Sequence, residues 1–181
     1  LVLCVCLVVW FGGYAEKWTQ ERDACRDWMN ARILYRSGAY EAANRAYEKL
    51  YPSLRKKGAF LFEYGHSLHK AGFYNESNKY LDKALVYCAD PMILNVIGKN
   101  YQALRCYNWA EELLLASVHR LPGRIYPYYL LAKLYAEPEF LNREKFEEMK
   151  RIVLMKAPKI HSMAIEEMRR EVEEIAKEME K

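Results

Sequence analysis

The side chains with the clearest chemical potential are one glutamate and two histidines. Glu63, His66 and His69 are spaced by three residues, so they share one face of a helix. Carboxylate and imidazole donors in this arrangement suit a divalent metal, but such sites usually need a third or fourth ligand in fixed geometry. We therefore predict no metal site at these residues and no cofactor.

The remaining reactive side chains do not indicate catalysis. Cys88 and Cys106 have no base nearby in the sequence that would activate a thiolate. The five cysteines are an odd count and widely spaced, which argues against a disulfide framework. Phosphate loops, G-x-G-x-x-G and G-x-S-x-G motifs are absent from the sequence. We predict no catalytic residue in this segment.

The composition is that of one helical, globular domain. Of 181 residues, 52% are hydrophobic and 29% charged, which is enough apolar material for a core. Eight glycines and six prolines are few for a sheet protein with many turns. The net charge of +4 is spread over both signs, so we expect no nucleic-acid partner.

The first fourteen residues, LVLCVCLVVWFGGY, carry no charge. The run is shorter than the roughly 20 apolar residues that a membrane-spanning helix needs. It fits the end of a transmembrane helix over residues 1–18, with Trp10, Tyr14 and Trp18 at the interface, or a signal-peptide core cleaved near Ala15. We prefer the first, because three aromatic residues suit an interfacial belt. The balanced charges that follow do not indicate which side the domain faces.

A period of 33 or 34 residues runs through the rest of the chain. Such a period is the signature of stacked helical hairpins, in which small residues occur where two helices cross closely. Gly38 and Gly72 fall where the first helix of a hairpin should end in a left-handed conformation. The repeating columns are Ala31, Gly65, Gly98 and Ala132; Tyr40, Tyr74 and Tyr107; and Ala43, Ser77 and Ala110.

These landmarks resemble the tetratricopeptide repeat (TPR). The resemblance implies an all-α, right-handed superhelix (solenoid) of antiparallel helix hairpins with a C-terminal capping helix. From residues 1–18 we expect this array to be preceded by the end of a transmembrane helix. The stretch from Leu104 to Tyr107 lacks the Gly-x-Tyr of the first two turns, as does the fourth turn, so we expect both to be less regular. The array covers 24–158, with hairpins at 24–57, 58–90, 91–123 and 124–158, and the cap covers 159–181.

A narrower resemblance comes from APKIHSMAIEEMRREVEE, residues 157–174. It is similar to the C-terminal tail of O-antigen ligase or polymerase-type membrane proteins, some of which carry TPRs after their last span. This implies a bacterial inner-membrane protein of envelope polysaccharide assembly, whose glycan chemistry belongs to a part upstream of this segment. Two alternatives stay open: a stand-alone secreted or envelope TPR adaptor with a cleaved signal peptide, and a solenoid that braces its own membrane part.

The TPR register predicts a concave groove that is aromatic and basic. Such a lining suits a protein or peptide partner with an extended acidic segment, or a phosphate-bearing glycolipid, while residues 1–14 would contact the membrane. The alternative for Arg32, Lys99 and Lys133 is that they are merely solvated. The predicted groove residues are Trp28, Arg32, Tyr35, Arg36, Phe62, His66, His69, Lys70, Asn95, Lys99, Gln102, Tyr129 and Lys133.

Overall fold

The computed structural model describes the backbone of residues 2–158 and 160–180, and the side chains from residue 18 onward within those ranges. Every regular element in these ranges is a helix, which confirms the predicted all-α class. The helices form two compact units, Leu1–Cys88 and Ala89–Lys181. No helix in the described part of the chain is long and apolar enough to cross a membrane. The prediction for residues 1–18 falls largely on side chains outside the described set.

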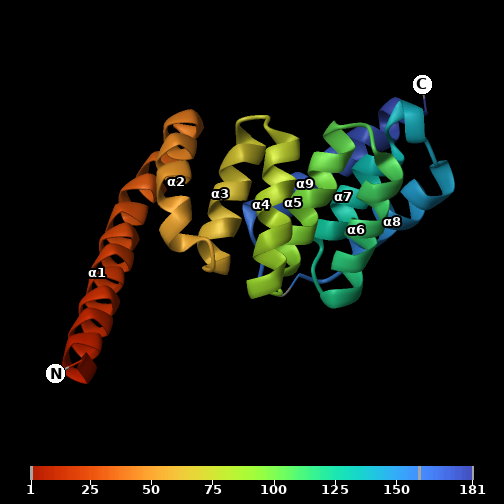
Figure 1. The fold of residues 1–181 in the computed structure, drawn as a ribbon. Coiled ribbons are helices and arrows are strands. Elements are labelled where there is room, and N and C mark those ends of the chain that lie inside the picture. The colour runs from red at the N-terminus through yellow and green to blue at the C-terminus, as the bar shows by residue number, and fades with distance from the viewer. Residues whose placement is uncertain (1, 159, 181) are drawn as a thin grey trace. The chain divides into compact units, whose positions relative to one another are not determined.

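Unit 1 consists of two antiparallel helical hairpins. Within it α1 packs on α2, α2 on α3, and α3 on α4. The first helix is much longer than its partner, so its N-terminal half projects beyond the end of α2 (Figure 1). The elements are α1 (Val2–Arg36), α2 (Tyr40–Leu54), α3 (Gly58–Lys70) and α4 (Tyr74–Tyr87).

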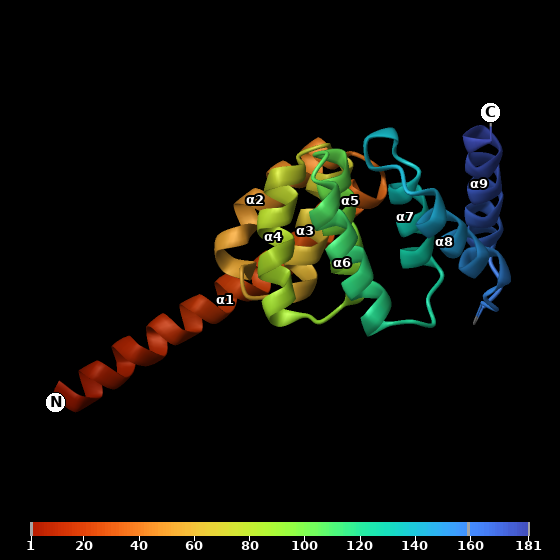
Figure 2. The ribbon, with the colours of Figure 1, turned by 90° about the vertical axis from the view of Figure 1, so that its right-hand side faces the viewer.

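Unit 2 contains two further hairpins and a final helix. The last helix, α9, packs against both α7 and α8 (Figure 2). Its residues Val172 and Ala176 join the buried core that also contains Leu131, Phe146 and Val153. The elements are α5 (Pro91–Ala103), α6 (Tyr107–Arg120), α7 (Tyr126–Tyr135), the 3-10 helix η1 (Pro138–Phe140), α8 (Arg143–Met155) and α9 (Met163–Met179).

The small residues predicted at the helix crossings are fully buried. In the α3–α4 hairpin, an added Cβ at Gly65 would stand 2.6 Å from Cγ of Leu81. The Ser77 hydroxyl donates a hydrogen bond of 2.7 Å to the Gly65 carbonyl oxygen, which ties the two backbones together. In the α5–α6 hairpin, Gly98 stands in the same relation to Leu114, with a Cβ distance of 2.9 Å. Close packing at these points therefore depends on the missing side chain.

The third turn is more regular than the sequence suggests. Gly38 and Gly72 have φ of 81° and 84°, as predicted for helix C-termini. Arg105 takes the same left-handed conformation with φ of 59°, and the amide of Cys106 donates to the carbonyl oxygen of Tyr101 as in the first two turns. The prediction of an irregular third turn was wrong, because the hydrogen bonds of the turn hold a non-glycine residue in this conformation.

The fourth turn is irregular, as expected. The segment between α7 and α8, residues 136–142, contains η1, whereas the other three hairpins use three-residue connections. The amide of Asn142 donates to the carbonyl oxygen of Tyr135 across the loop, and the Asn142 side chain then caps α8 by accepting from the amide of Lys145 at 3.0 Å. These two hydrogen bonds close the longer loop and start α8.

A larger side chain at a crossing should separate the helices of its hairpin. We expect Gly65→Leu to lower the free energy of unfolding by about 1–3 kcal/mol or more, because the new side chain meets Leu81 and the Ser77 backbone. Urea unfolding followed by circular dichroism measures the change. Ala59→Leu, at an exposed site on the same helix, is the control and should unfold like the parent. Equal midpoints for the two variants would contradict the packing described.

Candidate functional site

A row of aromatic rings forms the candidate binding surface of unit 1. The hydroxyl of Tyr35 on α1 shares a hydrogen bond with Nδ1 of His66 on α3. The His66 ring stacks between Phe62 and His69, each with its centroid 5.8 Å away. Tyr74, the first residue of α4, lies beside His69 at 5.9 Å. We call these five residues the ring surface.

Helical periodicity explains why these rings lie together. Phe62, His66 and His69 follow each other at spacings of four and three, so one face of α3 presents all of them. A neighbouring face of the same helix carries Leu61 and Leu68, which are buried in the core. The rings themselves are half-buried. They are therefore fixed by packing and still offer apolar faces to a ligand.

Two cations stand at the end of the ring surface. Arg36 and Lys70 occupy equivalent positions in the last turns of α1 and α3, one repeat apart. Both are exposed, and neither forms an ion pair within the described residues. A cation in this position also interacts favourably with the helix C-terminus, so its presence alone does not require a ligand. Beside the rings, however, the pair is placed to bind carboxylates.

Trp28 and Arg32 bind a carboxylate of their own molecule. Nη2 of Arg32 lies 2.7 Å from Oε1 of Glu63, and the Trp28 indole donates to Oε2 at 2.7 Å. The Arg32 guanidinium also stands 4.7 Å from the centroid of the Trp28 ring. The Tyr47 hydroxyl reaches the same carboxylate at 3.4 Å. Internal pairing therefore neutralises the charge of Arg32, which the sequence assigned to an external ligand.

The same arrangement occurs in unit 2 at the last repeat. Tyr129 and Lys133 on α7 both donate to the carboxylate of Glu171 on α9. The ammonium group of Lys133 lies 5.4 Å from the centroid of the Tyr129 ring. In each unit an aromatic residue and a cation four positions later thus bind one shared carboxylate. This carboxylate lies on α3 in unit 1 and on α9 in unit 2. Gln102 makes a simpler version, donating to Glu137 at 2.7 Å.

The carboxyl groups of these clusters titrate abnormally in unit 2. Burial by itself would raise the pKa of Glu171, but hydrogen bonds from Lys133 and Tyr129 outweigh it and hold the pKa below its usual value. The pKa of the Tyr129 phenol is raised by burial and by its bond to the same carboxylate. Glu111 follows this pattern with Lys145 and Tyr135, and its pKa is also lowered.

The predicted groove residues divide into three groups in the structure. Trp28, Arg32, Gln102, Tyr129 and Lys133 are engaged with carboxylates of the next repeat or of α9. In unit 2, Asn95 is buried, and Lys99 is half-buried. The residues gathered at the ring surface and its end are Tyr35, Arg36, Phe62, His66, His69 and Lys70.

Glu63, Glu171 and Tyr74 were missed as partners of these groups. The repeat period contains the signal for the carboxylates, because each follows its cation by roughly one repeat, at 31 residues for Glu63 and 38 for Glu171. Engagement of Glu63 by Arg32 and of His66 by Tyr35 also gives the candidate metal ligands other partners. Among the described residues, no group of three or more His, Cys, Asp and Glu side chains is placed to hold a metal ion.

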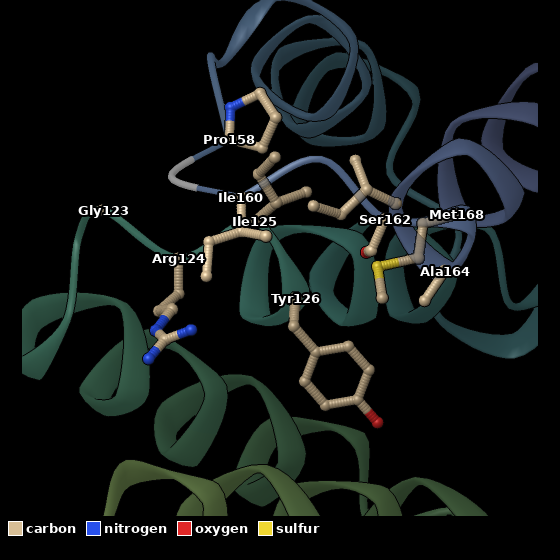
Figure 3. A pocket seen from close by; sticks show the side chains of 10 residues that line it. Gly123, Arg124, Ile125, Tyr126, Pro158, Ile160, Ser162, Ala164 and Met168 are labelled. Atoms are coloured by element: carbon tan, nitrogen blue, oxygen red, sulfur yellow. The ribbon is translucent and has the colours of Figure 1, made fainter.

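An apolar cavity of about 360 Å³ lies in unit 2, between the start of α7 and the start of α9. Figure 3 shows Ile125 and Tyr126 on the α7 side, with Ala164 and Met168 on the α9 side. Pro158 and Ile160 close it from the segment that joins α8 to α9. The lining suits a hydrophobic side chain of a ligand.

Comparison with known proteins identifies the fold but no family. No family model matches the sequence, and no curated protein matches it. Among solved structures, a double mutant of MamA RS-1 superposes with a TM-score of 0.62 at 22% identity, covering 86% of this chain and 96% of that one. A putative Podospora anserina kinesin light chain with nearly identical TPR-like repeats gives 0.60 at 16% identity, covering 87% and 93%. The fold is therefore TPR-like.

Removal of the shared carboxylate in unit 1 should destabilise the protein. In Glu63→Ala the half-buried Arg32 and the Trp28 indole lose their acceptor, and we expect a loss of about 1–3 kcal/mol in the free energy of unfolding. Glu48→Ala, an exposed glutamate of the same unit, is the matched control. A double-mutant cycle with Arg32→Gln isolates the coupling, and additive effects would show that the pair contributes nothing.

The cluster at Glu171 should make stability depend on pH. Its folded-state pKa is lowered, so the carboxylate stabilises the fold above the unfolded value of 4.5, and this contribution is lost as the pH falls through the lower folded value. Glu171→Gln should therefore be less stable than the parent near neutral pH, with the difference shrinking below 4.5. Thermal unfolding across this range checks it. A difference that stays constant with pH would exclude the ionic contribution.

Proposed function

We propose that this chain is a protein-interaction scaffold whose ring surface holds an extended acidic segment of a partner protein. The supporting observation is the row of fixed, half-buried rings that ends at Arg36 and Lys70. Rings provide apolar contact area at low entropic cost, and the two cations can each form a charge-assisted hydrogen bond with a carboxylate. The TPR-like fold supports the same function, because stacked hairpins create extended binding surfaces.

The internal pairing of the other cations favours this location. Arg32 and Lys133 already have carboxylate partners, so an acidic ligand would have to displace Glu63 or Glu171 to reach them. Arg36 and Lys70 require no such exchange. A phosphate-bearing glycolipid remains the alternative ligand for the same two cations, since phosphate oxygens accept the same hydrogen bonds as a carboxylate.

We further propose that the chain is the C-terminal part of a multipass O-antigen ligase or polymerase-type protein of the bacterial inner membrane. Support comes from the resemblance of residues 157–174 and from the uncharged residues 1–14. In this proposal the domain recruits partners of envelope polysaccharide assembly, and the glycan chemistry occurs elsewhere in the parent protein. The alternative is a stand-alone envelope adaptor with a cleaved signal peptide.

Site-specific photocrosslinking in the native host tests the binding surface. A photoreactive phenylalanine analogue in place of Phe62 should yield a discrete crosslinked protein, whereas the same analogue at the exposed Trp109 should not. The variant R36E/K70E should reduce the crosslink by about tenfold or more, as expected for lost charged hydrogen bonds. R45E/K79E changes the charge equally on two other helices and should leave it unchanged. Equal crosslinking at both positions would refute the site.

The size and location of the native protein test its parentage. An antibody against this chain should detect, in the inner-membrane fraction, a band far larger than the chain alone. The crosslinked partner should then belong to the polysaccharide machinery. A band no larger than this chain in the periplasmic or secreted fraction would instead establish the stand-alone adaptor.

A further inference from the structure

One end of unit 1 collects the C-terminus of α2, the N-terminus of α3 and the C-terminus of α4, because the hairpins are antiparallel. The first helix passes this end and continues beyond it (Figure 1). An ion pair fixes where it passes, since Nζ of Lys57, just before α3, lies 2.8 Å from Oε1 of Glu21. The backbone of residues 2–14 therefore lies on the far side of this end from the rest of the unit.

A cavity of about 290 Å³ opens at this end between α2 and α4. Lys83 donates a hydrogen bond of 2.6 Å to the Tyr51 hydroxyl, and its ammonium group lies 5.0 Å from the Tyr51 ring centroid. Arg55 and Lys56 are exposed, and in the described part of the chain neither has a carboxylate partner. The lining residues are Tyr51, Arg55, Lys56, Lys83, Val86 and Tyr87, with no acidic side chain among them.

Apolar side chains stand beside these cations in contact with solvent. Val86 is 77% exposed and Tyr87 is 50% exposed, and both line the same cavity. A site for a small soluble anion gains nothing from an exposed valine and tyrosine. At a bilayer surface, by contrast, aromatic and aliphatic side chains enter the interface while lysine and arginine reach the headgroups.

We propose that this end of unit 1, which we call the basic end, binds the anionic headgroups of a phospholipid bilayer. The inference rests on the proposed membrane attachment through residues 1–14. Along a helix, Glu21 lies about 10 Å beyond Tyr14 at 1.5 Å per residue. The basic end is thus held within about one Debye length of the headgroups, where each lysine or arginine interacts appreciably with anionic lipid. Contact there would orient the unit on the bilayer surface.

Vesicle binding by the full chain tests the basic end. Partition is measured on vesicles of phosphatidylcholine and on a three-to-one mixture with phosphatidylglycerol, and the ratio of the two coefficients reports the anionic contribution. R55Q/K83Q should lower this ratio by roughly 25-fold, at about fivefold for each cation. R45Q/K79Q removes one arginine from α2 and one lysine from α4. Both lie farther from this end, so this variant should lower the ratio much less. Circular dichroism verifies that both variants are folded.

The outcomes separate this inference from the membrane attachment. Binding to neutral vesicles reports the attachment, and the ratio reports the basic end. Equal ratios for the parent and R55Q/K83Q, or an equal loss in R45Q/K79Q, would overturn the basic end even if neutral vesicles bind. Binding to the anionic vesicles that depends on Arg55 and Lys83, without any binding to neutral vesicles, would support the basic end and refute the attachment. If glycerol phosphate at constant ionic strength lowers the ratio to one, the basic end binds a soluble phosphate ligand. That result would overturn the proposal that it binds a bilayer surface.

Discussion

The close approach of the two helices within each hairpin is the constraint on which the rest of the structure depends. At Gly65 and Gly98 the facing leucine occupies the space of a missing side chain, and at Ala31 and Ala132 an alanine is fully enclosed. Once each hairpin is closed at this distance, the first helices of successive hairpins within a unit are brought side by side. Side chains roughly one repeat apart in the sequence then meet, as Arg32 and Glu63 do.

Contacts between repeats determine which charged side chains remain available to bind a partner protein. A cation and an aromatic residue on one helix hold a carboxylate from the next, at Glu63 in unit 1 and at Glu171 in unit 2. Half-buried charges are costly unless they are paired, so removing one partner from either cluster would destabilise the stacking of repeats. Cations beyond the reach of a carboxylate, such as Arg36 and Lys70, are the ones that stay available. The stacking of repeats therefore determines which of these cations can bind a partner.

Unit 1 has such cations at two surfaces, which differ in the apolar side chains beside them. The ring surface combines two cations with aromatic side chains held in place by stacking and a hydrogen bond, which suits a polypeptide ligand. The basic end combines cations with exposed Val86 and Tyr87 beside the helix that leads to the uncharged N-terminal residues. Because the ring surface includes the first residue of α4, Tyr74, and the basic end includes its last residue, Tyr87, one unit could contact a membrane and a partner protein together.

The sequence by itself determined the helical class, the period, the crossing residues and the left-handed ends at Gly38 and Gly72. These features follow from local sterics repeated at a fixed spacing, so they can be predicted from residue types and positions. It did not determine the conformation of Arg105, which only the hydrogen bonds of the folded turn reveal. Nor could it show that Arg32 forms an ion pair with Glu63, or that Lys133 forms one with Glu171. Pairing between repeats depends on side-chain reach across a helix interface, and residue type and spacing do not specify that distance. Tertiary structure alone therefore decided which of the predicted groove cations are free to bind.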